Sequence, residues 1–131
     1  MRHYDRTDST TARAKEWVEE GAVHGSVVLA DFQEAGRGRL GRRWESDSAQ
    51  NLLITIVIKK HLPRPTLLPL AAAMAVYDAL LKIESTLDIT LKWPNDVLIG
   101  GKKTAGILIE SPSEDIYLLG IGINVNQENF P

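Results

Sequence analysis

The chain has 131 residues, of which 44% are hydrophobic and 24% charged, proportions typical of one globular domain with a small core. Its formal net charge of -2 provides no overall positive field that would attract nucleic acid. The chain has no cysteine, which excludes a disulfide framework, thiolate catalysis and a cysteine zinc site, and its three histidines lie too far apart to predict a metal cluster.

The N-terminal residues do not have the pattern of a secretory signal, because no apolar stretch follows them. The longest apolar-rich run, residues 67–81, contains Pro69, Tyr77 and Asp78. It is shorter than the roughly 20 residues needed to span a bilayer. We therefore expect a cytoplasmic protein that does not associate with a membrane.

The first half of the chain predicts two strands and one helix. A helix is expected over residues 10–20, because capping residues precede spaced apolar residues and Gly21 follows them. The β-rich residues 26–32 predict a strand that enters a loop of glycine and arginine. Residues 51–58 predict a second strand, apolar on both faces and therefore near the centre of a sheet.

The second half predicts one more helix and several strands. The helix is expected over residues 66–85, with Thr66 as its cap, and its nearly all-round apolar surface predicts burial against a sheet. Strands are then expected at residues 89–92, 96–99, 102–110 and 116–126, with the glycines at 100–101 joining the middle two as a hairpin. The pattern predicts a single α+β domain with a largely antiparallel sheet and helices packed on it.

The strongest chemical signal is the segment at residues 36–44, which contains three glycines, four arginines and a tryptophan. Glycine lets a backbone approach a ligand closely, and guanidinium groups bind anions. The segment is therefore expected to be a loop that holds a negatively charged group. Taken alone, it is also typical of a solvated loop or of a nonspecific contact with nucleic acid.

Four other polar clusters lie beside the predicted strands, and each has an ordinary structural interpretation. Residues 9–11 have the sequence of a helix cap, and residues 94–96 that of a turn. The glycines at 100–101 fit a hairpin, and those at 120 and 122 a bulge. Trp93 fits the core or a pocket wall better than a reactive position.

Together the clusters resemble the catalytic domain of biotin protein ligases. Residues 36–44 match the family's GRGRxGRxW, and Lys92-Trp93-Pro94-Asn95-Asp96 matches its KWPND. Residues 103–110 match KxAGILxE, and residues 120–126 match GxGINxN. The motifs occur in the family's order and differ from the arginine-glycine pattern of lipoate ligases. The resemblance implies the mixed, largely antiparallel fold shared with class II aminoacyl-tRNA synthetases.

The resemblance also implies the reaction. The family joins biotin and ATP into biotinyl-5′-adenylate and then transfers biotin to a lysine of a biotin carboxyl carrier protein domain. Biotin and ATP are thus expected as substrates, with Mg²⁺ and without a bound prosthetic group. The implied catalytic residues are Lys103, Arg37 and Asp96. Lys103 would stabilise charge at phosphorus as a cation, while Asp96 would either bind Mg²⁺ with Asn95 or help the acceptor lysine lose its proton.

The implied binding residues divide between the two halves of the adenylate. Those for biotin are polar groups that suit its neutral ureido ring, loop residues that hold its carboxyl group, and strand glycines that allow close approach. They are Ser9, Thr10, Thr11, Gln33, Gly36, Arg37, Gly38, Arg39, Lys103, Gly106 and Gly122. Those for ATP or the adenylate are Arg37, Arg39, Arg42, Trp44, Lys92, Asn95, Lys103 and Asn124. The family usually has asparagine at the position of Thr11, and Lys92 fits a surface charge as well as a phosphate contact.

The extent of the resemblance leaves two alternatives for function. Residues 1–131 are expected to be one catalytic domain, incomplete at its C-terminus, without the DNA-binding domain and the C-terminal β-barrel of some relatives. The chain is then either a ligase or a module that binds biotin or the adenylate with little turnover. A nucleic-acid protein is a third reading that the net charge opposes. An uncovered sheet predicts a homodimer.

Overall fold

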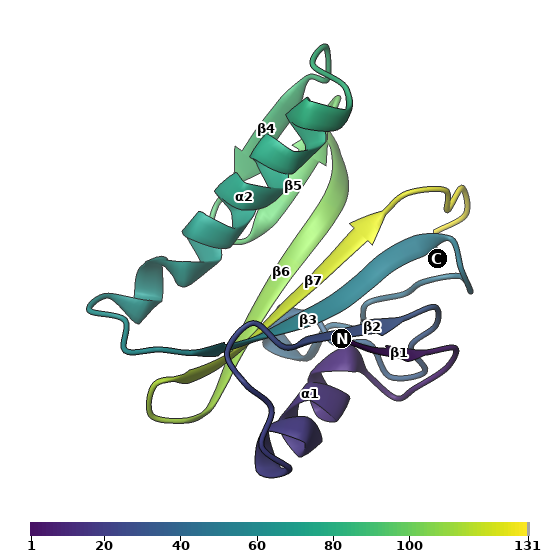
Figure 1. The fold of residues 1–131 in the computed structure, drawn as a ribbon. Coiled ribbons are helices and arrows are strands. Elements are labelled where there is room, and N and C mark those ends of the chain that lie inside the picture. The colour runs from purple at the N-terminus through teal and green to yellow at the C-terminus, as the bar shows by residue number, and fades with distance from the viewer. Residues whose placement is uncertain (131) are drawn as a thin grey trace.

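The computed structural model describes residues 1–130, which form one seven-stranded sheet with two helices (Figure 1). The strands lie in the order β1-β2-β3-β7-β6-β5-β4, and only the β1–β2 pair is parallel. The strands are β1 Arg2–Tyr4, β2 Val27–Ala30, β3 Asn51–Lys59, β4 Ile89–Lys92, β5 Asp96–Ile99, β6 Lys102–Ser113 and β7 Ile116–Asn124. The predicted α+β fold with a largely antiparallel sheet is confirmed.

The edge strand β1 was not predicted from the sequence. It has three residues, too few to show a period, and it is held by pairing with β2 and by contacts to the first helix. The guanidinium of Arg2 lies 4.3 Å from the ring centroid of Trp17 and 2.8 Å from a carboxylate oxygen of Glu20. These contacts join residues distant in sequence, so a local pattern could not indicate them.

The first helix, α1 (Thr10–Glu19), forms where the sequence predicts it. The hydroxyl of Ser9 accepts a hydrogen bond of 3.0 Å from the backbone N–H of Ala12, which caps the helix. Ala14 packs with residues of β2, β3 and β7 in one of two hydrophobic clusters. This cluster packs the middle of α1 against the sheet.

The second helix, α2 (Leu68–Ile83), differs from its prediction in two ways. It follows a 3-10 turn, Pro65–Leu67, that contains Thr66, so Thr66 is not its cap. Only Ala72, Ala73 and Val76 are buried, because a helix on the outside of a sheet presents one face to it. The expected burial is therefore wrong for most of the surface of α2.

The helical stretch Pro65–Ile83 also exceeds the apolar run that the sequence outlines. With 19 residues it is long and apolar enough, by length and composition alone, to cross a membrane. Core helices pass the same test, and here the buried residues of α2 pack against β5, β6 and β7 in the second hydrophobic cluster. The expectation of a protein that does not associate with a membrane stays a prediction.

The two helices cover opposite faces of the sheet, toward opposite ends (Figure 1). On β7, Leu119 and Ile121 contribute to the cluster under α2, whereas Leu118 contributes to the cluster under α1. The alternation of a strand therefore turns Gly120 and Gly122 toward the α1 face. Gly122 is paired with Gly106 of β6, so the middle of that face has neighbouring positions without side chains.

Candidate active site

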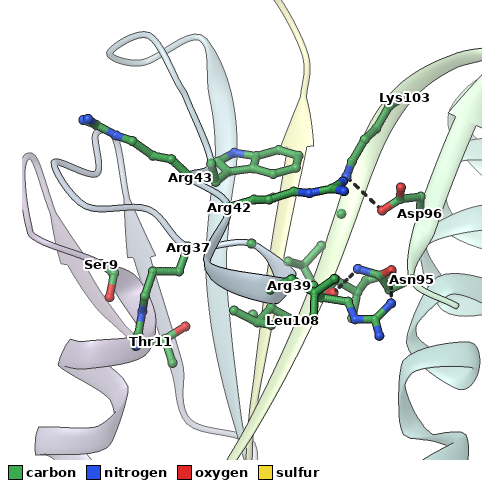
Figure 2. Close-up of a pocket in the computed structure, with 18 of the residues that line it drawn as sticks. Ser9, Thr11, Arg37, Arg39, Arg42, Arg43, Asn95, Asp96, Lys103 and Leu108 are labelled. Atoms are coloured by element: carbon green, nitrogen blue, oxygen red, sulfur yellow. Dashed lines mark hydrogen bonds and ion pairs between the residues drawn. The ribbon is translucent and has the colours of Figure 1, made fainter.

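A pocket of about 310 Å³ lies over these glycines, between the N-terminus of α1 and the turn that joins β4 to β5 (Figure 2). Every predicted site residue lines it except Gly36 and Asn124. Those that line it are Ser9, Thr10, Thr11, Gln33, Arg37, Gly38, Arg39, Arg42, Trp44, Lys92, Asn95, Asp96, Lys103, Gly106 and Gly122. Segments far apart in the sequence thus meet at one cavity, as expected from the resemblance of their motifs to one family.

One end of the pocket is uncharged, buried and internally hydrogen-bonded. The backbone N–H and the hydroxyl of Thr10 donate to Oε1 of Gln33 at 2.8 and 3.0 Å. The hydroxyls of Thr10 and Thr11 lie 2.8 and 3.2 Å from the hydroxyl of Thr55. All four side chains are buried, and the network holds them in fixed orientations.

Thr55 belongs to this network but was missed from the sequence. It lies on β3, is 0% exposed, and links the two threonines of α1. A polar residue in the middle of an otherwise apolar strand was the available signal. Gly120 was also missed as a lining residue. A Cβ at Gly120 would lie 3.2 Å from the hydroxyl of Thr11, so glycine leaves room for that hydroxyl.

The start of α1 is anchored by Asp8. Its carboxylate accepts hydrogen bonds from the N–H of Ser9 at 2.7 Å, from Thr7 at 2.9 Å and from Arg13 at 3.2 Å. Burial raises the pKa of Asp8, but these hydrogen bonds and the charge of Arg13 outweigh it and hold the pKa below its ordinary value. The ionised carboxylate therefore stabilises the segment that carries the threonines.

The glycine-arginine loop, residues 36–44, folds back on itself above the strands. The N–H of Gly38 donates to the carbonyl of Arg42 at 2.7 Å, and the N–H of Trp44 donates to that of Gly36 at 2.9 Å. At the tip, Leu40 has a φ of 57°, in the left-handed region where side chains are disfavoured. The loop is therefore a tight turn, and its four arginines line the pocket.

The indole of Trp44 lies directly against the strand glycines. A Cβ at Gly106 would lie 2.7 Å from Cζ3 of Trp44, and one at Gly122 would lie 2.6 Å from Cε2. Both distances are too short for real atoms, so only glycine admits the indole at these positions. The structure thus places Trp44, rather than open space, against the two glycines. Gly36 is required for a similar reason, since its Cβ would lie 2.7 Å from the carbonyl oxygen of Trp44.

The other end of the pocket is charged and more open. The ammonium of Lys103 lies 2.9 Å from Oδ1 of Asp96, and NH1 of Arg39 lies 3.4 Å from Oδ1 of Asn95. Lys103 and Asp96 thus form an ion pair. Within residues 1–130, the buried Oδ1 of Asp96 has no hydrogen bond of good geometry. Figure 2 shows Arg42 pointing toward the same end. This end brings together cations suited to an anionic ligand.

Arg37 lies apart from the other predicted catalytic residues. Its guanidinium lies 3.0 Å from a carboxylate oxygen of Glu110 and, in Figure 2, points toward Thr11 at the uncharged end. Lys103 and Asp96 are therefore brought together, whereas the side chain of Arg37 is not directed at them. Glu110, the last residue of the KxAGILxE match, was not predicted as a site residue.

Three other residues lie at the edges of the pocket. Trp93 lines it but is 71% exposed, so it belongs to a pocket wall and not to the core. Lys92 lines it with an exposed side chain. Asn124 does not line it, but donates to the carbonyl of Lys103, which does, at 3.4 Å. Within residues 1–130, Oδ1 of Asn124 and Nε1 of Trp44 are buried without a hydrogen-bond partner.

The residues present allow one position for a magnesium ion in the pocket. Asp96 is the one carboxylate among the described lining residues, and Mg²⁺ is commonly held by one or two carboxylates together with substrate phosphates. Away from the pocket, His3, Asp5 and Asp31 place possible ligand atoms within 4.8 Å of one another, a proximity the sequence did not predict. The hydrogen bond to Asp31 raises the pKa of His3. None of these three residues is among the described residues that line the pocket.

Comparison with known proteins agrees with the motifs. The model of the biotin/lipoate A/B protein ligase family matches residues 4–126. The chain is 38% identical over 137 residues to the bifunctional ligase/repressor BirA of Bacillus subtilis, covering 98% of this chain and 42% of that protein. It is 42% identical over 127 residues to a biotin–[acetyl-CoA-carboxylase] ligase of Paracoccus denitrificans, covering 92% of this chain and 52% of that protein.

Solved structures agree with the fold. The biotin protein ligase of Aquifex aeolicus in complex with biotin and ATP superposes with a TM-score of 0.86 at 40% identity, covering 98% of this chain and 53% of that one. The Leishmania major enzyme in complex with biotinyl-5-AMP gives 0.89 at 27% identity, covering 99% and 59%. The chain thus spans about half the length of the relatives it matches. With the family model matching nearly its whole length, the chain belongs to the biotin/lipoate A/B protein ligase family.

Proposed function

We propose that this chain carries the site at which biotin is activated with ATP and then transferred to a lysine of a biotin carboxyl carrier protein domain. The observation that carries the proposal is the division of the pocket. A buried, uncharged polar end faces a cationic end, and biotinyl-5′-adenylate has a neutral ring at one end and a phosphate further along. Relatives solved with biotin and ATP, or with biotinyl-5-AMP, support the same assignment.

The uncharged end suits the ureido ring. A neutral ring with N–H and C=O groups needs short, fixed partners in an otherwise apolar pocket. Thr11 and Gln33 offer such groups, and Thr10 and Thr55 hold them in place. The hydroxyl of Ser9 accepts the capping hydrogen bond of α1, which fixes its position, and its own O–H can still donate to the ring.

The charged end suits the activation step. An oxygen of the biotin carboxylate attacks the α-phosphorus of ATP, the bond from that phosphorus to the bridging oxygen breaks, and pyrophosphate leaves. Two anions must approach each other, so cations placed beside them lower the barrier. Lys103 lies at this end with Arg39 and Arg42, and its ammonium serves as a cation at the reacting centre. Within residues 1–130, Asn124 and Trp44 each have a buried polar atom without a hydrogen-bond partner, which supports their assignment to the adenylate.

The role of Asp96 has two forms. It would hold Mg²⁺ together with phosphate oxygens, or it would accept a proton from the acceptor lysine as the amine attacks the acyl carbon and AMP leaves. The variant Asp96→Asn separates them. Loss of magnesium-dependent pyrophosphate release supports the metal role, whereas intact release with lost transfer supports the proton role.

The alternative of a binding module with little turnover is not favoured, because the relatives are named as ligases. The nucleic-acid reading is weakened by the pairing of loop arginines with acidic residues. Arg37 pairs with Glu110 and Arg43 with Glu45. A homodimer stays a prediction, supported by β1 and β4 at the edges of the sheet and tested by sedimentation.

The decisive experiment measures pyrophosphate release with biotin and ATP, followed by labelling of a purified carrier domain. We expect release that depends on biotin and a carrier labelled on lysine. Desthiobiotin keeps the ureido ring but lacks the thioether ring, so it serves as a control for the contribution of the thioether ring. Omission of ATP serves as a control for activation. Binding of biotin without pyrophosphate release would support the binding module instead.

A further inference from the structure

The loop at residues 36–44 is attached to the sheet at two places. At its C-terminal end, the indole of Trp44 lies against Gly106 and Gly122. Near its N-terminal end, the guanidinium of Arg37 pairs with Glu110 at 3.0 Å. Arg37, Trp44 and the two glycines line the pocket, and between the two attachments Arg39 reaches Asn95 at 3.4 Å.

Glu110 is placed for this purpose by the alternation of β6. Gly106 faces the indole and Leu108 lines the pocket, so Glu110, two residues further on, lies on the same face. It is paired across the sheet with Leu118, which is fully buried. Its side chain is 34% exposed, less than the 54% of Arg37. Among residues 1–130, Arg37 is its one ion-pair partner.

The charge of Glu110 matters because of where it lies. Arg37 points toward Thr11, at the end of the pocket that is otherwise uncharged (Figure 2). A guanidinium without a counter-ion would attract the ligand's carboxylate to that end. Paired with Glu110, it contributes no net charge, and the cations at the Lys103 end stay the stronger attraction.

We propose that Glu110 is a positioning residue that acts through Arg37. Its carboxylate holds the first half of the loop over the uncharged end of the pocket and neutralises the guanidinium there. The ring of the ligand is then enclosed at one end while its carboxylate is directed to the other. The part of this inference that concerns the ligand rests on the proposed function.

The first test needs no ligand, because the loop contains several arginines that trypsin recognises. The rate of cleavage after Arg39, Arg42 and Arg43 reports how often the loop opens. We expect Glu110→Gln to raise this rate about fivefold, the upper range for a partly exposed ion pair. Arg37→Ala should raise it equally, and the double variant should add nothing. Glu114→Gln, which removes an exposed carboxylate from the same hairpin, should leave it unchanged.

The cleavage results decide whether the ion pair holds the loop. Equal rates for Glu110→Gln and the unaltered chain would overturn the proposal. Additive effects of the two substitutions would overturn it as well, since they would show that each residue acts independently. Thermal unfolding of each variant is measured alongside, and an unchanged midpoint for Glu110→Gln assigns faster cleavage to the loop and not to the fold.

The second test concerns the ligand. We expect Glu110→Gln to raise the KM for biotin and the dissociation rate of biotinyl-5′-adenylate about fivefold, with kcat unchanged. Faster cleavage with unchanged dissociation would overturn the role in ligand binding. If the unaltered chain does not bind the adenylate, the proposed function fails, while the cleavage rates still decide whether Glu110 holds the loop.

Discussion

The two ends of the pocket are built in different ways. At the uncharged end, Thr10, Thr11, Gln33 and Thr55 are buried and bonded to one another. At the charged end, the side chain of Lys103 is 49% exposed and paired with Asp96, while Arg39 reaches Asn95 over 3.4 Å. One end is a part of the core, and the other is a set of long side chains on the surface.

The difference teaches how one site treats the two halves of a ligand. A neutral ring is recognised by groups that cannot move, because small misplacements lose hydrogen bonds. Phosphates and carboxylates change position during the reaction, and long cationic side chains can follow them. We therefore expect substitutions at the uncharged end to affect folding as well as binding, and those at the charged end to affect the reaction alone.

The largest effect is expected at the charged end. Replacement Lys103→Met should lower pyrophosphate release at least about 100-fold, because it removes a cation from the reacting centre. The free energy of unfolding should change little, since Lys103 is half exposed. Lys102→Met, an exposed neighbour, is the matched control and should keep full activity. A loss below about tenfold for Lys103→Met would contradict the role assigned to its ammonium.

Between the two ends of the pocket, Gly122→Ala should disturb the packing of the Trp44 indole against β7. The new methyl group would lie 2.6 Å from the indole, so the ring or the strand must shift, at a cost of about 1–3 kcal/mol in unfolding free energy. Adenylate binding should weaken with it. Gly38→Ala, where the methyl group would lie 3.4 Å from its nearest neighbour, is the control in the loop. Equal stability of the two variants would show that the indole moves aside freely.

At the uncharged end, Thr55→Val should lower the free energy of unfolding by about 1–2 kcal/mol, since it removes the hydroxyl partner of Thr11 and one of the two partners of the Thr10 hydroxyl. Biotin affinity should fall as well, as the threonines lose their fixed orientation. Urea denaturation and calorimetric titration measure the two effects. Thr90→Val on β4, which is exposed, should leave both unchanged.

The smallest effect concerns the anchor of α1. The folded-state pKa of Asp8 is lowered, so its ionised form stabilises the fold at pH values above the ordinary pKa of an aspartate, about 3.9. That contribution is lost as the pH falls through the lowered folded-state value. Asp8→Asn should therefore be less stable than the unaltered chain at pH 6, and the difference should shrink below about pH 4. A constant difference across this range would rule out the ionised carboxylate as its source.

The sequence predicted the sheet, both helices and the grouping of motifs around one pocket. These predictions succeeded where the signal is local. In residues 36–44, for example, the glycines and arginines indicate a loop and an anion site without reference to any other segment. The strand at residues 51–58 was predicted near the centre because it is apolar on both faces, and β3 does lie between β2 and β7.

The contacts between distant segments could not be predicted. Thr55 and Glu110 act through partners more than 40 residues away in the chain, and no local pattern reports such pairs. The uncovered surface of α2 was missed for a related reason. Apolar composition shows that burial would be favourable, but only the packing shows that Met74 stays 53% exposed.

The packing of Trp44 against the strand glycines has a consequence for local opening of the sheet. Where neighbouring strands would normally contribute their own side chains, β6 and β7 have glycines, and a residue from a loop shields that part of the backbone. Amide hydrogens near Gly106 and Gly122 should therefore exchange with deuterium at a rate set by the loop, although they lie in the middle of the sheet. A ligand that holds the loop against the sheet would slow that exchange. The exchange rates of amides in β6 and β7 would therefore report whether the site is occupied.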